Sequence, residues 1–276
     1  MEELTLQQKL WKGAGVFWYS AKPLLLYLCF PALLMCFGMM LFGGRDTQAI
    51  LSQSSNFYYA LGILLTLAVL HGRSKRRGSS LFKDAALEWR GLSFKRLLLL
   101  LAAGFGAAVF FSALITLLPF PEALSGAYHA SSSKVLSGTD QAVAMLSVVF
   151  FAPVAEEVIF RGYMLGRLLS WFTCGQAVAV SALVFALCHV SILWMAYAGL
   201  LGLALGWVSL REDNTVYSIA LHVGFNLSVL PTSLINGKAG LKELFFGSPV
   251  KIFGLGALAG FLALWAYRRY QKEEIV

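Results

Sequence analysis

The feature that most constrains the fold is a series of long apolar runs with only short polar segments between them. A hydrocarbon core about 30 Å thick needs roughly 20 mostly apolar residues in a helix for one crossing. Runs of about that length occur at Pro23–Phe42, Ile50–His71, Leu97–Leu118, Gln141–Phe160, Gly175–Val190, Leu193–Leu210, Thr215–Leu234 and Lys251–Tyr267. We therefore expect an all-α, polytopic membrane bundle of about eight transmembrane helices.

The composition supports this fold class. Hydrophobic residues make up 58% of the chain and charged residues 13%, whereas soluble domains have roughly 45–50% and 25%. The runs are continuous rather than alternating, which argues against a membrane β-barrel. The first run lacks the small-residue cleavage pattern of a secretory signal, so we expect it to remain as the first span. No long linker interrupts the chain, and we treat residues 1–276 as a single membrane domain.

The formal net charge of +8 would suggest a nucleic-acid partner in a soluble chain. Here the basic residues lie next to the apolar runs, as the positive-inside rule predicts, so we expect contact with the bilayer and no nucleic acid. The segment between the second and third runs is the most basic and contains Arg73, Lys75, Arg76, Arg77, Lys83, Arg90, Lys95 and Arg96. We predict that this segment and both termini are cytoplasmic. Lys238, Lys242 and Lys251 fit less well, since eight spans would place them outside.

Three charged residues lie in or beside the fourth run, within the string FFAPVAEEVIFRGYML. A charged side chain at membrane depth costs at least about 2.5–3.5 kcal/mol, so such residues are functional candidates by default. Glu157 and Arg161 are four apart and lie on one helical face within ion-pair distance. Glu156 points about 100° away and is left free for another role. Alternatively, Arg161 only anchors the span at the inner interface, with Glu157 as its counter-ion.

Two histidines and an asparagine follow in later runs. His189 lies in the fifth run, and His222 and Asn226 share one helical face of the seventh. If the fourth and fifth spans form a hairpin that turns near Thr173, Glu156 and His189 both lie about 25 Å from the turn. Taken singly, each histidine could equally be a hydrogen-bonded packing residue.

These residue types favour activated water over a nucleophilic side chain, because no serine, cysteine or aspartate partner accompanies them. A glutamate in an apolar setting can take a proton from water, while imidazole and amide groups stabilise the oxyanion that forms on an attacked carbonyl. Two histidines and a glutamate are also a known zinc ligand set, although the H-E-x-x-H spacing is absent. The chemistry of the residues leaves this zinc alternative open.

Other small residues in the runs have simpler interpretations. Five glycines repeat at helical spacing and are typical of close helix packing in lipid: Gly199, Gly202, Gly206, Gly256 and Gly260. The four cysteines form no C-x-x-C pair and mostly lie within runs, where cysteine behaves as a small apolar residue: Cys29, Cys36, Cys174 and Cys188. We infer neither a disulfide nor a metal site from them.

Three strings in this order resemble the motifs of the CPBP family, which comprises CAAX prenyl proteases and bacteriocin-processing or self-immunity (ABI) proteins. They are A-P-x-x-E-E-x-x-F-R-G from Ala152 to Gly162, F-x-x-x-H from Phe185 to His189, and H-x-x-x-N from His222 to Asn226. The resemblance covers about residues 141–235, which we take as the catalytic core. It implies a glutamic intramembrane endopeptidase with eight helices, no cofactor and no required metal.

The resemblance also implies a role for each motif residue. Glu156 would be the general base that activates water, assisted by His189. His222 and Asn226 would bind the oxyanion, and Glu157 and Arg161 would orient and tune the base. Phe185 would shape the wall of the substrate pocket, or simply pack in the core.

Family members act on prenylated CAAX tails, peptide pheromones, bacteriocins or membrane-anchored sorting tails. The short loops suggest a multi-pass protein of a bacterial inner membrane, so we expect a membrane-associated peptide or protein tail as substrate. The alternative is a non-catalytic scaffold, immunity or chaperone protein of the same family. A transporter is disfavoured, because the polar residues crowd toward one side and no inverted repeat is evident.

Overall fold

A computed structural model describes residues 6–42, 47–135, 141–236 and 238–273, and within these ranges it contains helices and no strand. The long helices are α1 (Leu6–Phe42), α2 (Thr47–Arg76), α4 (Phe94–Leu117), α10 (Ile192–Glu212) and α14 (Pro249–Gln271). One further long helix is divided into α6 (Gln141–Leu146), the π-helix η1 (Ser147–Phe151), α7 (Ala152–Glu157), the π-helix η2 (Val158–Leu165) and α8 (Gly166–Leu168). The shorter helices are α3 (Leu81–Asp84), α5 (Glu122–Val135), α9 (Cys174–Leu187), α11 (Thr215–Leu227), α12 (Val229–Asn236) and α13 (Ala239–Phe246).

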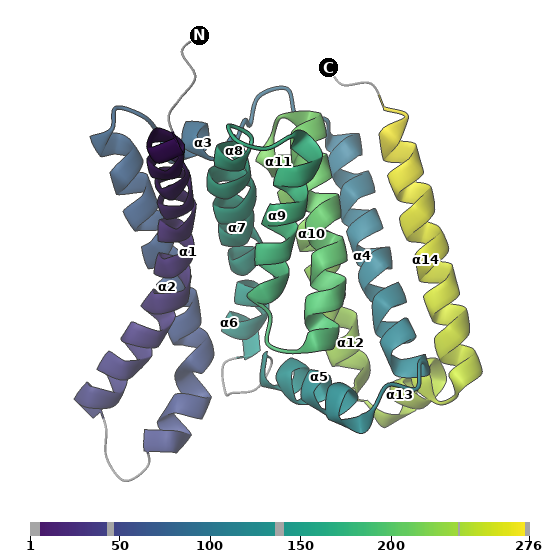
Figure 1. Ribbon diagram of the computed structural model, residues 1–276. Coiled ribbons are helices and arrows are strands. Elements are labelled where there is room, and N and C mark those ends of the chain that lie inside the picture. Colours follow the sequence, from purple (N-terminus) through teal and green to yellow (C-terminus); the bar gives the residue numbers. More distant parts are fainter. Residues whose placement is uncertain (1–5, 43–46, 136–140, 237, 274–276) are drawn as a thin grey trace.

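The helical membrane architecture is confirmed. Within the described ranges, six helices are long and apolar enough to cross a membrane, and two shorter apolar helices, at Cys174–Leu187 and Thr215–Pro231, match the fifth and seventh predicted runs. The number of eight spans and the cytoplasmic orientation of the termini stay predictions. In Figure 1, α1 begins and α14 ends on the same face of the bundle, which is the arrangement that an even number of crossings requires.

The short α9 differs in extent from the predicted run Gly175–Val190. It starts as predicted after the turn near Thr173, whose side chain accepts a hydrogen bond from the backbone of Gln176 in a capping box. It ends at Leu187, and Ser191 already caps the start of α10. His189 therefore lies in the connection between two helices. Its predicted place inside the fifth span was wrong, because the capping residues at both ends leave only a short helix.

Small residues determine how closely the central helices approach. Gly202 and Gly206 of α10 lie against Ala182 and Val178 of α9, as their spacing predicted. Helices α4 and α11 also approach closely, and Gly224 lies against the backbone of Leu101 there. A second glycine, Gly104 of α4, lies against the backbone of α11 in the same way.

The bundle has a densely packed centre and two peripheral elements. The helix that contains α7, together with α9, α10 and α11, forms the centre, and α14 packs along the outer side of α4. On the opposite side, α1 and α2 pack on each other and contact the centre mainly through η1, η2 and the short helices next to them. Figure 1 shows this pair at the purple and blue edge of the bundle.

We expect Gly224→Ala to destabilise the bundle by roughly 1–3 kcal/mol, because its Cβ would overlap backbone that cannot turn away. Thermal unfolding in detergent measures the loss. Gly254→Ala in α14 is the matched control, since no atom lies within 4 Å of the Cβ that it would add. Equal unfolding temperatures for the two variants would contradict the close approach of α4 and α11.

Candidate active site

The two adjacent glutamates lie at the end of α7, between two π-helical segments. Pro153 has no backbone N–H, so it cannot donate the hydrogen bond that continues an α-helix. At η1 the backbone hydrogen bonds span five residues instead of four. The backbone N–H of Ala152, for example, donates to the carbonyl of Ser147. Such π segments recur at functional sites, because they change the direction of the side chains that follow.

Glu157 lies at the centre of a buried polar network. Its side chain is fully buried, and its Oε1 accepts a hydrogen bond from Nη1 of Arg161 at 2.9 Å. Nδ1 of His222 lies 3.0 Å from the same oxygen. Nη2 of Arg161 donates to the carbonyl of Gly202 in α10 at 3.0 Å. The network thus joins three parts of the bundle, and the predicted pairing of Glu157 with Arg161 is confirmed.

The network also determines the orientation of the His222 ring. An ionised carboxylate only accepts hydrogen bonds, so Nδ1 of His222 carries the hydrogen toward Glu157. Nε2 then faces Glu156, whose Oε2 lies 3.7 Å away. One imidazole therefore lies between the two glutamates.

Glu156 has a different environment from its neighbour. Its side chain keeps 15% of its surface exposed, whereas that of Glu157 has none. The hydroxyl of Tyr27 in α1 donates to Oε1 of Glu156 at 2.6 Å, and the hydroxyl of Tyr59 in α2 lies 2.6 Å from that of Tyr27. Because the Tyr27 hydrogen points to Glu156, Tyr59 donates to Tyr27. The interpretation of one paired and one available acid agrees with this geometry.

Phe185 lies between the two histidines. Its ring contacts the rings of His189 and His222, with centroids 4.9 and 5.7 Å away. The guanidinium of Arg161 lies 4.8 Å from the centroid of Phe185. Phe185 is almost fully buried, so its ring both packs in the core and holds the imidazoles apart.

The ring of His189 is held at the end of α9 by a backbone carbonyl of that helix. Its Nδ1 lies 2.9 Å from the carbonyl oxygen of Phe185, and its ring is also next to that of Trp194. In the described part of the chain, no hydrogen bond joins His189 to Glu156 directly. The structure brings His189 to the same site through Phe185, and its assisting role stays a prediction.

Asn226 lies one turn after His222 on α11, as the spacing predicted. Its Nδ2 donates to the carbonyl of Val148 in η1 at 2.8 Å. The amide therefore supports the π segment in front of the glutamates. An amide nitrogen carries two hydrogens, so one is left for a reacting oxygen. Oxyanion binding by Asn226 stays a prediction.

Tyr27 and Tyr59 are neighbours of Glu156 that no sequence motif indicated. Each tyrosine places a hydroxyl within an apolar run. Because a buried hydroxyl needs a hydrogen-bond partner, such a tyrosine is a weak signal that a polar site is near. Tyrosine is nevertheless common in membrane helices at the interface. Only the packing of α1 and α2 against α7 identifies these two as neighbours of Glu156.

The alternative use of these residues is as metal ligands. Across the described ranges, no three histidine, cysteine, aspartate or glutamate side chains are grouped so that they could hold a metal ion. The metal-free mechanism stays a prediction that needs an experiment.

The fold and site together define a polytopic helical membrane protein with an acid and imidazole site among its spans. Residues 138–228 match the family described as type II CAAX prenyl endopeptidase Rce1-like, a segment that contains all three motifs. This match confirms the resemblance to the CPBP endopeptidases and supports an endopeptidase-type function in the membrane. No curated protein and no solved structure matches the chain.

We expect Arg161→Met to lower the free energy of unfolding by about 3–5 kcal/mol, because it leaves Glu157 buried without its partner. Unfolding in detergent measures this, and the double variant Arg161→Met/Glu157→Leu should recover most of the loss. Arg167→Met is the control, since Arg167 is exposed and stacks on Tyr19. A loss at Arg161 no larger than at Arg167 would contradict the network.

Proposed function

We propose that the protein is an endopeptidase that hydrolyses a peptide bond in a membrane-associated peptide or protein tail, using water activated by Glu156. The observation that carries this proposal is the contrast between the two acids. Glu157 is buried and neutralised by Arg161, whereas Glu156 is partly exposed and 3.7 Å from the imidazole of His222. An acid that is free to accept a proton, next to hydrogen-bond donors, is the arrangement that water activation requires.

The proposed hydrolysis uses Glu156 and the polar side chains around it. Glu156 takes a proton from water, and the hydroxide attacks the carbonyl carbon of the scissile bond. Asn226 donates a hydrogen bond to the oxyanion, His222 does so from Nε2 when both of its ring nitrogens carry a hydrogen, and His189 assists the base. The tetrahedral intermediate then collapses, the C–N bond breaks, and Glu156 returns its proton to the leaving amine. Water supplies both the hydroxyl of the new carboxylic acid and the hydrogen of the new amine.

The remaining polar residues position this machinery. Glu157 and Arg161 hold the ring of His222 so that Nε2 faces the reacting side of the site. The hydrogen bond from Tyr27 fixes one oxygen of Glu156 and leaves Oε2 on the side of His222. Because a general base must lie within hydrogen-bond reach of the proton that it takes, this orientation matters as much as the charge.

The substrate class is inferred from the surroundings. The matched family is described by its action on prenylated CAAX proteins, and that substrate is one candidate for this chain. The site lies among apolar spans, so a substrate reaches it from within or beside the bilayer. We favour an unmodified peptide or the membrane-proximal tail of a protein, cleaved near the cytoplasmic face of a bacterial inner membrane.

We expect Glu156→Ala to lower cleavage by roughly 10²–10⁴-fold, the usual contribution of a general base. Purified protein would be tested on a panel of tails that includes a prenylated CAAX peptide, with His189→Ala in parallel. Glu122→Ala, an exposed acid at the start of α5, is the control and should cleave as the parent does. Cleavage by Glu156→Ala at the parental rate would refute the assignment.

We expect Tyr27→Phe to lower kcat by about 10-fold while changing stability by only about 1 kcal/mol, because it removes one hydrogen bond to Glu156. KM should change little, because that hydrogen bond orients the base and not the substrate. Tyr267→Phe in α14 is the control, because its ring contacts Tyr270, away from the site. A kcat of Tyr27→Phe equal to that of the parent would contradict its positioning role.

The non-catalytic alternative has one specific observation in its favour. Asn226 donates to a backbone carbonyl and so supports the fold as well as any oxyanion. A scaffold should tolerate Glu156→Gln in a complementation assay, whereas a protease should not. Loss of cleavage in a strong chelator, restored by zinc, would instead favour the metalloenzyme.

A further inference from the structure

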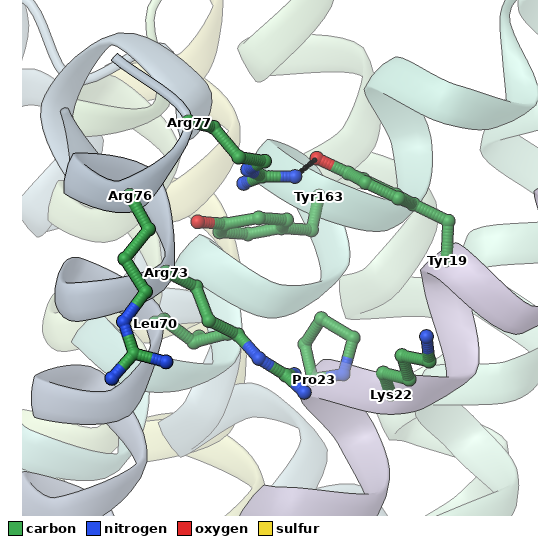
Figure 2. A pocket seen from close by; sticks show the side chains of 8 residues that line it. All are labelled: Tyr19, Lys22, Pro23, Leu70, Arg73, Arg76, Arg77 and Tyr163. Carbon is green, nitrogen blue, oxygen red and sulfur yellow. Dashed lines mark hydrogen bonds between the residues drawn. The ribbon is translucent and has the colours of Figure 1, made fainter. Parts of the chain in front are cut away.

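A cavity with a basic lining, called the basic cavity below, lies between α1, α2 and η2, at the end of the bundle where the apolar span of α1 begins and that of α2 ends. Its volume is about 290 Å³, and four basic residues line it: Lys22, Arg73, Arg76 and Arg77 (Figure 2). None of the proposed catalytic residues lines this cavity. Positive charges that lie together in one cavity favour the binding of an anion.

One of the four cations is already compensated. Arg77 pairs with Asp84 at 2.9 Å and donates to the hydroxyl of Tyr19 at 2.8 Å, the bond drawn in Figure 2. Burial acts to raise the pKa of Asp84, but hydrogen bonds from Ser74 and Ser79 and the charge of Arg77 outweigh it and lower that pKa below its ordinary value. Asp84 is therefore ionised at neutral pH and balances Arg77.

The other three cations have no such partner. Among the residues that the structure describes, no carboxylate lies within ion-pair distance of Lys22, Arg73 or Arg76. Lys22 belongs to α1, and the two arginines belong to α2. The positive charges on the two helices repel each other across the cavity, and an anion bound between them would replace that repulsion with attraction.

The surroundings of the cavity indicate a lipid headgroup. Its lining includes the buried apolar residues Pro23 and Leu70. Trp18, next to it on α1, is exposed, and the ammonium of Lys22 lies 5.0 Å from its ring centroid. Exposed tryptophan collects at the headgroup level of a bilayer. Below that level α1 presents exposed apolar side chains such as Leu25, along which an acyl chain can lie.

We propose that this cavity binds the phosphate of an anionic phospholipid, held between Lys22 of α1 and Arg73 and Arg76 of α2. Guanidinium groups bind phosphate oxygens through paired charge-assisted hydrogen bonds, and basic pockets between membrane helices on the cytoplasmic side suit such headgroups. The bound phosphate bridges α1 and α2. These helices carry Tyr27 and Tyr59, so the lipid also supports the hydrogen bonds to Glu156.

The test is native mass spectrometry of the full-length protein in detergent, with equal amounts of phosphatidylglycerol and phosphatidylcholine. The parent should retain phosphatidylglycerol at least roughly 10-fold better, and Arg73→Gln/Arg76→Gln should remove that preference. Lys75→Gln/Arg268→Gln is the matched control, because it removes two exposed cations, near the ends of α2 and α14, that do not line the cavity. Arg73→Lys/Arg76→Lys keeps the charge and should keep most of the preference.

Two further measurements identify the source of the phosphate and separate lipid binding from catalysis. Lipid that stays bound in millimolar inorganic phosphate supports the headgroup, whereas displacement with stoichiometric uptake of phosphate assigns the site to free phosphate. Glu156→Ala should bind lipid as the parent does, whether or not it cleaves. Equal retention of both lipids, a preference that survives in Arg73→Gln/Arg76→Gln, or displacement by an acidic peptide at lower concentration than by phosphate would overturn the proposal.

Discussion

The carboxylate of Glu157 is the group on which the rest of the site depends. Taking a charge out of water costs several kcal/mol, so it is tolerated only with partners that are held in place. Here Arg161 and His222 supply those partners, and Arg161 in turn donates to a carbonyl of α10. The network ties η2, α10 and α11 together. Because Glu156 is the residue directly before Glu157 in the chain, the same network determines where the available acid points.

The site therefore has a rigid side and a peripheral side. On the rigid side, η2, α9 and α11 hold Arg161, Phe185 and His222 against one another through buried contacts. On the peripheral side, Tyr27 contacts Glu156 from α1, a helix that packs mainly on α2. Residues 138–228, which match the family, contain the rigid side only. The motif residues thus lie in the segment that matches the family, and residues of helices outside that segment contact them.

This division connects the two proposals. Water activation requires that one oxygen of Glu156 stays oriented while the other takes a proton, and α1 provides that orientation through Tyr27. A phosphate between α1 and α2 would hold the two helices at the spacing that this hydrogen bond needs. The tyrosines and the basic cavity lie on the same pair of helices. On the two proposals taken together, bilayer composition would therefore affect the geometry of Glu156 through α1.

Much of the fold and the motif residues could be predicted because they depend on short-range patterns. Apolar runs predict the spans by length alone, and the spacing of Glu157 and Arg161 predicts their pairing. The predicted place of His189 was wrong because helix ends depend on capping residues, here Thr173 and Ser191, which the apolar pattern does not reveal. The oxyanion roles and the substrate stay predictions, since they involve a molecule that the chain does not contain.

The sequence by itself determined that this protein is a helical membrane bundle with two acids, two imidazoles and an amide at helical spacing, because length, apolarity and period are local properties. Only the tertiary structure decided that His222 lies between the two glutamates, that Tyr27 binds Glu156, and that three cations from α1 and α2 face one cavity. These contacts join residues far apart in the chain. They depend on how closely helices pack at positions such as Gly224, where the absence of a single side-chain atom sets the distance between two helices.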